Sequence, residues 1–257
     1  MPRANRHFLP DLVWHITHRC HEREFLLRFH QDRKRWRRWL YEARKRYGLC
    51  ILDYIVTSNH VHLLVRDRGQ GEIPRSMQLI AGRTGQAFNH RKGRKGAFWE
   101  DRYHATAVQT GDHLARCLTY IDLNMVRAGA VVHPGEWEFG GYREIQSPPA
   151  RYRIIDLQAL MHALEIDSMD ELRRQHRIRV EDSLAAGTQE RDDRWTRSLA
   201  VGSQPFVREV QRKMGLDAQA RTITVDSGDA CLREPAAAYR VHFAEEKWPS
   251  RPLRDAK

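Results

Sequence analysis

The order of strand-like and helix-like segments predicts an α+β protein built on an antiparallel sheet. Up to residue 129 the order is strand, helix, strand, strand, helix, strand, helix. Only four residues separate the strand segments 49–56 and 61–65. Such a short connection can join antiparallel strands but not parallel ones, which need a long crossover. The stretch Gln146-Ser147-Pro148-Pro149-Ala150 then interrupts the pattern. We therefore expect one domain over residues 1–147 and a mainly helical C-terminal extension over residues 148–257.

The first half of the predicted domain reads as a strand, a helix and a hairpin. Alternating apolar residues predict a strand over residues 12–17. The next helix ends at Gly48, because glycine commonly terminates helices. Its apolar face consists of Phe29, Trp36, Trp39, Leu40, Ala43 and Tyr47. Residues 49–56 and 61–65 predict two strands joined by a turn at residues 57–60.

The second half of the domain begins with a helix that starts near Pro74, a residue suited to a first helical turn. The buried stripe of this helix is Met77, Ile80, Ala81, Thr84 and Phe88. Residues 90–96 form a basic, glycine-containing loop, which is either a flexible turn or a nucleic-acid contact. We favour the contact, because a mobile basic loop can close over a phosphate backbone. Residues 98–109 predict another strand, and a last helix lies between Gly111 and Gly129.

Two histidines flank one apolar residue in the run His60-Val61-His62. Alternate side chains of a strand point to the same face, so both imidazoles point one way and Val61 points into a core. Two neutral imidazoles side by side form half of a divalent-metal site. The alternative is that they are simply part of a polar face.

The helix before Gly129 carries an apolar stripe and a separate polar stripe. The apolar stripe is Leu114, Leu118, Ile121 and Met125, and the polar stripe is Arg116, Tyr120, Asn124 and Arg127. Tyr120 and Asn124 are four residues apart, so both can reach one point in space. A phenol nucleophile, an amide oxygen for a metal and two arginines for phosphate suit phosphodiester chemistry. The alternative is an ordinary amphipathic helix with a half-buried tyrosine.

The chain has 257 residues and a formal net charge of +11. Residues 1–150 contain 25 basic and 15 acidic side chains, a balance of +10, and the remaining residues have a balance of only +1. Because the excess charge coincides with the motifs, a phosphate polymer is the expected partner. A membrane surface is the alternative, but no long apolar run or polybasic tail supports it.

The cysteines predict free thiols in a reducing compartment. None of Cys20, Cys50, Cys117 and Cys231 stands in a CxxC spacing. The residues that precede the first predicted strand lack the apolar run of a signal peptide. We expect a cytoplasmic protein without disulfide partners.

The histidine pair and the tyrosine helix together resemble a known family. His60-Val61-His62 is similar to the HUH motif, and residues 120–129 resemble the tyrosine helix of REP-associated tyrosine transposases, relatives of the single-tyrosine HUH transposases. Further matches in the same order are Tyr47-Gly48-Leu49, Ser76-Met77-Gln78, Gly82-Arg83, Phe98-Trp99-Glu100-Asp101-Arg102-Tyr103, Trp195, Ala200-Val201-Gly202-Ser203 and Phe206-Val207. The resemblance is good over residues 8–147 and thin beyond. Met125 departs from it, because the family usually has proline after the helix asparagine.

The resemblance implies a ferredoxin-like or RRM-like sheet with helices on one face. It also implies metal-dependent cleavage and rejoining of single-stranded hairpin DNA of the REP type. Tyr120 would be the nucleophile and would form a 5′-phosphotyrosine, leaving a free 3′-hydroxyl. His60, His62 and Asn124 would hold one Mg²⁺ or Mn²⁺, and two imidazoles suit Mn²⁺ at least as well. The residues expected to bind DNA are Arg83, Arg91, Lys92, Arg94, Lys95, Arg102, Arg116 and Arg127.

Several alternatives remain open at the level of the sequence. A non-catalytic DNA-binding regulator would use the same basic surface, and a metal-dependent RNA nuclease is a third possibility. The protein is either a monomer or a homodimer. Metal affinity should fall below about pH 6, because protonated imidazoles cannot ligate. Residues 151–257 are either a helical DNA-binding appendage or a cover for the sheet, and their near-zero net charge leans towards the second.

Overall fold

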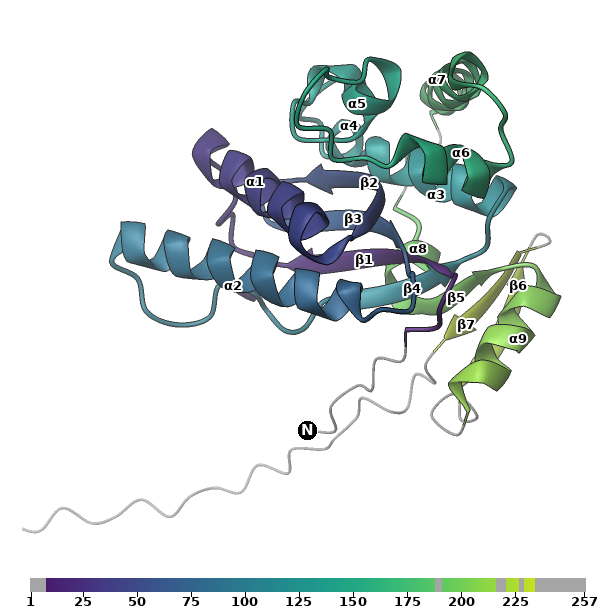
Figure 1. The fold of residues 1–257 in the computed structure, drawn as a ribbon, viewed down its shortest axis with the longest axis horizontal. Helices are drawn as coiled ribbons and strands as arrows, with labels where there is room; N and C mark the ends of the chain where they lie inside the picture. The colour runs from purple at the N-terminus through teal and green to yellow at the C-terminus, as the bar shows by residue number, and fades with distance from the viewer. Residues whose placement is uncertain (1–7, 188–190, 216–220, 227–228, 234–257) are drawn as a thin grey trace, which may run out of the picture.

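The computed structural model describes residues 8–187, 191–215, 221–226 and 229–233. Its centre is a seven-stranded sheet with the order β2-β3-β1-β4-β5-β7-β6 (Figure 1). The strands are β1 (Val13–Arg19), β2 (Cys50–Val56), β3 (His60–Arg66), β4 (His104–Val108), β5 (Ser198–Gly202), β6 (Thr222–Asp226) and β7 (Asp229–Arg233). All neighbouring strands are antiparallel except β4 and β5, which are parallel.

The predicted order of elements up to the tyrosine helix is confirmed. The helices are α1 (His30–Tyr47), α2 (Glu72–Lys92), α3 (Asp112–Asp122), α4 (Asn124–Arg127), α5 (Tyr142–Gln146), α6 (Leu157–Leu164), α7 (Met169–Ala185), α8 (Arg194–Arg197) and α9 (Gln204–Met214). Two short 3₁₀ turns lie at His21–Arg23 and Pro134–Glu136. None of the helices that the structure describes is both long and apolar enough to cross a membrane.

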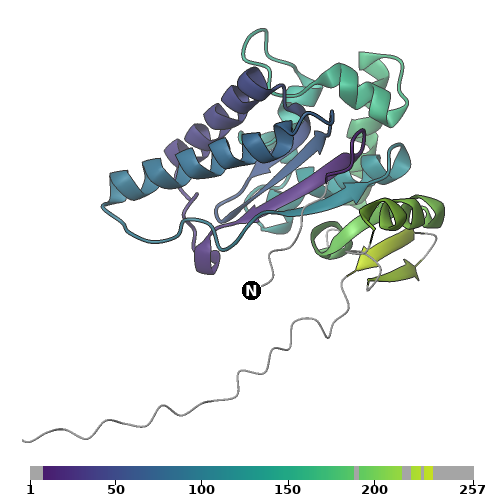
Figure 2. The same cartoon turned by 60° about the horizontal axis from the view of Figure 1, so that its bottom comes forward.

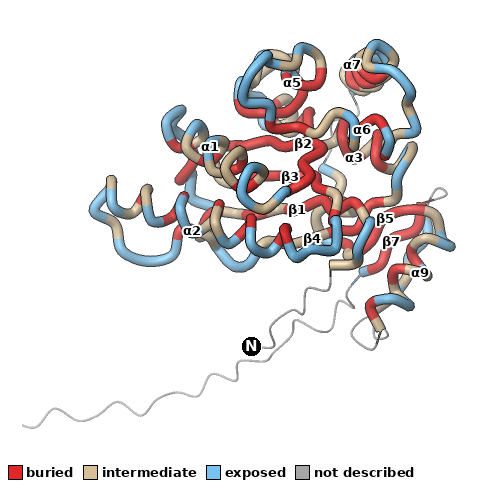
Figure 3. The backbone as a smooth tube through the Cα atoms, in the orientation of Figure 1, coloured by how far each residue is buried: buried red, intermediate tan, exposed pale blue. Residues whose placement is uncertain are grey.

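Helices cover both faces of the sheet, so the expectation of helices on one face is wrong. Trp99 stacks on His18 with ring centroids 4.0 Å apart, and its indole donates a hydrogen bond to the Ala81 carbonyl of α2. Helices α1 and α2 pack side by side on that face (Figures 1 and 2). On the opposite face, His62 of β3 contacts Asn124 of α4. Strands β1, β2 and β3 are therefore buried on both sides, as their largely buried course shows (Figure 3).

Two predicted boundaries differ from the structure around the basic loop. Helix α2 continues to Lys92 and ends at Gly93, which has a left-handed φ of 59°. Arg91 and Lys92 therefore belong to the last helical turn rather than to a loop. The predicted strand over residues 98–109 shrinks to β4, because Phe98 packs on Phe88 of α2 at a ring-centroid distance of 5.1 Å.

The C-terminal region contributes three strands that the helical periodicity did not predict, although helices still predominate in it. Ala200 and Val201 of β5 pair with Ala107 and Val108 of β4, so strands from both predicted regions form one sheet. Gly202 ends β5 where a Cβ atom would lie only 2.5 Å from the Phe206 ring and 2.7 Å from the Gln109 side chain. The division at residue 147 stays a prediction.

Candidate active site

Three polar side chains converge at one end of β3. His60 and His62 point to the same face of the sheet, as strand alternation requires. The Nε2 atom of His60 lies 3.3 Å from Oδ1 of Asn124, and Nε2 of His62 lies 3.1 Å from Nδ2 of the same amide. The three proposed metal ligands therefore meet, although 62 residues or more separate the histidines from Asn124 in the chain.

The surroundings of His60 fix its tautomer. Its Nδ1 atom lies 2.8 Å from Oδ1 of Asn59 and 3.0 Å from Oγ1 of Thr57. Both atoms accept here, because the Asn59 amide nitrogen donates to the Arg23 carbonyl and the Thr57 hydroxyl donates to the His60 carbonyl. The Nδ1 atom of His60 therefore carries the proton, and its Nε2 atom presents a lone pair.

This lone pair faces the Asn124 carbonyl oxygen, so two acceptors oppose each other. Such a contact is unfavourable unless a cation lies between the two atoms, and it is the arrangement expected of a metal site. Among the described residues, His, Cys, Asp and Glu side chains form no metal cluster of three or more. Asn124 is thus the candidate for a third ligand, and a set of two imidazoles and one amide would fit a divalent ion such as Mn²⁺ or Mg²⁺.

Burial keeps both candidate ligands neutral. Desolvation lowers the pKa of His60 to about 4, and it lowers the pKa of His62 well below the usual value. The arginines Arg19 and Arg127 act in the same direction on both rings. Proton competition for the metal should therefore begin at a lower pH than the value of about 6 that applies to ordinary imidazoles.

Tyr120 lies beside the histidines. Its ring centroid is 6.0 Å from that of His62 and 6.3 Å from that of His15. The Arg127 guanidinium lies 4.1 Å from the Tyr120 ring centroid and donates a 2.6 Å hydrogen bond to the Tyr120 carbonyl. Burial raises the pKa of the Tyr120 phenol, while the charges of Arg127 and Arg191 oppose that rise. Arg127 is therefore placed to stabilise a phenolate.

The predicted helix up to Gly129 is two helices. Helix α3 ends at Asp122, and α4 begins at Asn124 after Leu123, whose ψ of 3° departs from the helical value. The chain still turns in the same direction, because the Arg127 amide donates to the Leu123 carbonyl at 2.9 Å. The break leaves Tyr120 and Asn124 on the same side, next to β3.

The residues predicted to bind DNA fall into two groups. Arg91 bonds to the buried carboxylate of Asp32, and Arg116 makes a two-bond pair with Asp229 at 2.6 and 2.7 Å. Arg94 donates to the Ala97 carbonyl at 2.7 Å. Internal partners thus occupy these three cations. Arg127 likewise bonds to the Tyr120 carbonyl. The exposed members of the set are Arg83, Lys92, Lys95 and Arg102.

Sequence reasoning missed a group of arginines around the site. The positive charges of Arg23, Arg191 and Arg197 lower the pKa of Arg19, together with burial as the main cause. Arg19 follows His18 at the end of β1, and Arg191 and Arg197 come from the C-terminal region. No motif marks the last two. The charge of Arg191 acts on His60 as well as on Arg19, and the charge of Arg197 acts on Arg19.

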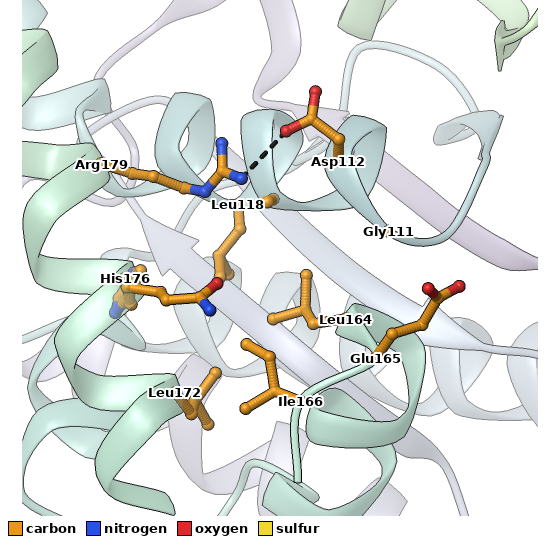
Figure 4. A pocket seen from close by; sticks show the side chains of 11 residues that line it. Gly111, Asp112, Leu118, Leu164, Glu165, Ile166, Leu172, His176 and Arg179 are labelled. Carbon is orange, nitrogen blue, oxygen red and sulfur yellow. Dashed lines mark ion pairs between the residues drawn. The ribbon is translucent and has the colours of Figure 1, made fainter. Parts of the chain in front are cut away.

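A separate pocket of about 230 Å³ lies on another flank of α3, where α6 and α7 complete its wall (Figure 4). Arg179 and Asp112 form an ion pair of 2.9 Å at its edge (Figure 4). Leu118 and Leu164 line its apolar part. The lining includes neither Tyr120 nor a proposed metal ligand, so this pocket is distinct from the candidate active site.

Comparison with known proteins gives a match over the part of the chain that holds this site. Residues 9–124 match the sequence model of the family described as "Transposase IS200 like". The matched segment includes β1, β3 and α3, and it ends at Asn124. No curated protein matches the chain.

Two solved structures are similar to the chain. A REP-associated tyrosine transposase bound to a REP hairpin is 19% identical, covers 61% of this chain and 94% of its own, and has a TM-score of 0.48. A provisionally assigned transposase of Deinococcus radiodurans is 18% identical, covers 47% of this chain and 95% of its own, and has a TM-score of 0.33. The family match supports transposase-like DNA processing as the class of activity. Residues 9–124 are therefore similar in sequence to the IS200-like transposases, in agreement with the resemblance that the motifs indicated.

Proposed function

We propose that this protein is a metal-dependent transesterase that cuts and rejoins single-stranded DNA through Tyr120. The observation that carries the proposal is the convergence of His60, His62 and Asn124 beside the Tyr120 ring. A nucleophile, a set of ligands for a divalent ion and a guanidinium within 4.1 Å of the ring centroid stand at one place. An ordinary amphipathic helix on a polar sheet face gives no reason for this combination.

In the proposed reaction the Tyr120 oxygen attacks the scissile phosphorus and loses its proton. The new bond joins the tyrosine oxygen to phosphorus, and the bond from phosphorus to the 3′-oxygen breaks. The departing strand takes up a proton and ends in a 3′-hydroxyl. A divalent ion held by His60, His62 and Asn124 would supply charge stabilisation for the phosphate oxygens.

Arg127 supplies the protein's own contribution to this step. A free phenol has a pKa of about 10 and is a weak nucleophile at neutral pH. Because the guanidinium favours the phenolate, it lowers the cost of removing the proton. The energy of the broken ester remains in the phosphotyrosine, so attack by a 3′-hydroxyl can rejoin DNA without ATP. The substrate proposed from the sequence resemblance is a hairpin of the REP type.

The test is a labelled single-stranded hairpin incubated with Mn²⁺ and resolved on a denaturing gel. Wild type should give a free 5′ fragment that ends in a 3′-hydroxyl, and a band of protein covalently joined to the 3′ fragment. Tyr120→Phe should bind DNA but give neither product, since only the phenol oxygen is missing. Tyr142→Phe is the matched control, because Tyr142 packs in α5 against His133. Cleavage by Tyr120→Phe at the wild-type rate would leave the non-catalytic or RNA-directed alternatives as better explanations.

The metal assignment has its own test by calorimetric Mn²⁺ titration. Replacing both His60 and His62 with alanine should abolish binding. Asn124→Ala should weaken binding less, because water can replace a neutral amide oxygen on a hard ion. Equal affinity of the wild type and the double histidine variant would remove these imidazoles from the ligand set.

A further inference from the structure

His15 of β1 is a fully buried histidine next to the proposed metal ligand His62. Its Nε2 atom lies 2.8 Å from Nδ1 of His62, and the two rings are nearly parallel with centroids 5.0 Å apart. On its other side, Nδ1 of His15 lies 2.8 Å from the main-chain carbonyl oxygen of Trp195. A continuous line of hydrogen bonds thus connects the C-terminal region with the metal ligand.

The chemistry of these atoms allows one arrangement of protons. A carbonyl oxygen can only accept, so Nδ1 of His15 carries the proton. A neutral His15 ring then has a lone pair on Nε2, and Nδ1 of His62 must donate to it. The Nε2 atom of His62 is consequently left with a lone pair, directed at the Asn124 amide.

The reverse arrangement would require a doubly protonated His15. Such a ring would donate to His62, force the proton of His62 onto Nε2 and remove the lone pair that a metal needs. It would also bury a positive charge whose hydrogen-bond partners are a neutral carbonyl and a neutral imidazole. An uncompensated buried charge of this kind is strongly disfavoured.

The carbonyl that ends this line is held firmly in place. Trp195 belongs to α8 and its side chain is buried. The Thr106 hydroxyl of β4 lies 3.2 Å from the Trp195 oxygen and 2.6 Å from the Ser198 oxygen. The neighbouring residue Arg194 forms an ion pair of 2.5 Å with Asp229 of β7. These contacts are independent of any ligand at the site.

We propose that His15 is a positioning residue, which together with the Trp195 carbonyl holds His62 in the tautomer that can bind a divalent ion through Nε2. The C-terminal segment that includes α8 and β5 is then part of the active site rather than a mere cover for the sheet. This inference deepens the proposed function and rests on it for the role of the ion. The tautomer itself is a property of the metal-free protein.

The first measurement is the histidine ring nitrogen spectrum of the full-length, metal-free protein labelled with ¹⁵N. His62 should show a protonated Nδ1 and a lone pair on Nε2. In His15→Leu this preference should be lost, while His15→Gln supplies an amide oxygen as acceptor and should retain it. A wild-type His62 protonated on Nε2 would overturn the inference whatever the variants do.

The second measurement is Mn²⁺ affinity by calorimetry. Partners that orient a metal-bound histidine are typically worth about 10–100-fold in affinity, so His15→Leu should lose about that much and His15→Gln much less. His104→Leu is the matched control, because His104 also bonds a carbonyl of the C-terminal region, that of Ser198 at 2.9 Å. Unchanged affinity in His15→Leu would refute the role in positioning.

The outcomes separate this inference from the proposed function. If wild type binds no Mn²⁺ but His62 has the expected tautomer, the proposed metal chemistry is wrong. The inference that His15 and the Trp195 carbonyl fix the tautomer of His62 is then still supported. If His15→Leu does not fold, the wild-type spectrum and His15→Gln still decide. A His15→Gln protein that is folded, with His62 protonated on Nε2 and Mn²⁺ bound as tightly as in wild type, would also overturn the inference.

Discussion

Replacing His176 should destabilise the helix that carries the tyrosine. His176 of α7 bonds through Nε2 to the Asp122 carboxylate at 2.6 Å, and both side chains are only 1% exposed. Gln146 donates to Nδ1 of His176 and to the Arg173 carbonyl, while its oxygen accepts from Arg177. The Nδ1 atom of His176 is therefore an acceptor, so the ring is neutral and donates its single proton to Asp122.

The magnitude follows from what His176→Leu leaves behind. Asp122 would keep its buried carboxylate but lose this donor, and a hydrogen bond to a charged group is typically worth about 1.5–3 kcal/mol. In Asp122→Asn the amide oxygen can still accept from His176, so the loss should be about 1 kcal/mol. The double variant, which combines His176→Leu with Asp122→Asn, no longer buries the carboxylate. It should therefore be more stable than His176→Leu alone.

The assay is urea unfolding of the three variants at neutral pH, with the midpoint and the slope fitted separately. The slope should remain unchanged while the midpoint falls. Two results would refute the argument that the His176 donor stabilises the Asp122 carboxylate. One is a loss of unfolding free energy below about 1 kcal/mol in His176→Leu, and the other is strictly additive losses in the double variant.

Three further predictions concern pH, catalysis and DNA binding. Burial raises the pKa of Asp53 well above its usual value, so the folded state holds a proton that the unfolded state releases above about pH 4. This stabilising contribution is present at low pH and is lost as the pH rises. In thermal unfolding, the stability of Asp53→Asn relative to wild type should therefore increase from pH 4 to pH 8, and a stability difference that stays constant over this range would contradict the prediction. Arg127→Gln should slow single-turnover cleavage at least about tenfold and move its pH profile upward, because the charge that favours the Tyr120 phenolate is gone; an unchanged profile would exclude that role. Arg19→Ala should reduce the slope of log affinity for single-stranded DNA against log salt by about one, whereas Lys45→Ala, on the exposed side of α1, should not; equal slopes would show that Arg19 contacts no phosphate.

Local periodicity was sufficient to predict the first part of the fold and the arrangement within each of the two site motifs, whereas the meeting of the two motifs was expected from the family resemblance. The alternation around Val61 placed both histidines on one face, and the four-residue spacing placed Tyr120 beside Asn124. These relations depend on neighbours in the chain, which a single sequence displays. The end of the predicted helix was wrong in detail, because the break at Leu123 leaves no mark in the apolar stripe.

The remainder depended on contacts between distant segments. His15 alternates with Trp14 and Ile16, so its side of the strand was readable, but its partner depends on the pairing register of β1 with β3. Strand β5 is only five residues long and lies among helices, so nothing local indicated that it extends the sheet. Arg191 and Arg197 precede β5 in the chain, so a sequence that does not reveal the pairing of β5 with β4 does not reveal their position either.

The hydrogen-bond acceptor of His15 Nδ1 is the main-chain oxygen of Trp195. This determines which mutations can affect the protonation of His62. A substitution of the Trp195 side chain alters the packing of an indole but leaves every backbone carbonyl in the chain. The protonation of His62 would therefore respond to the position of α8 rather than to the identity of residue 195. An event that displaced this segment by an ångström or two, such as DNA binding at Arg191 or Arg197, would break the hydrogen bond that orients His62, the proposed metal ligand.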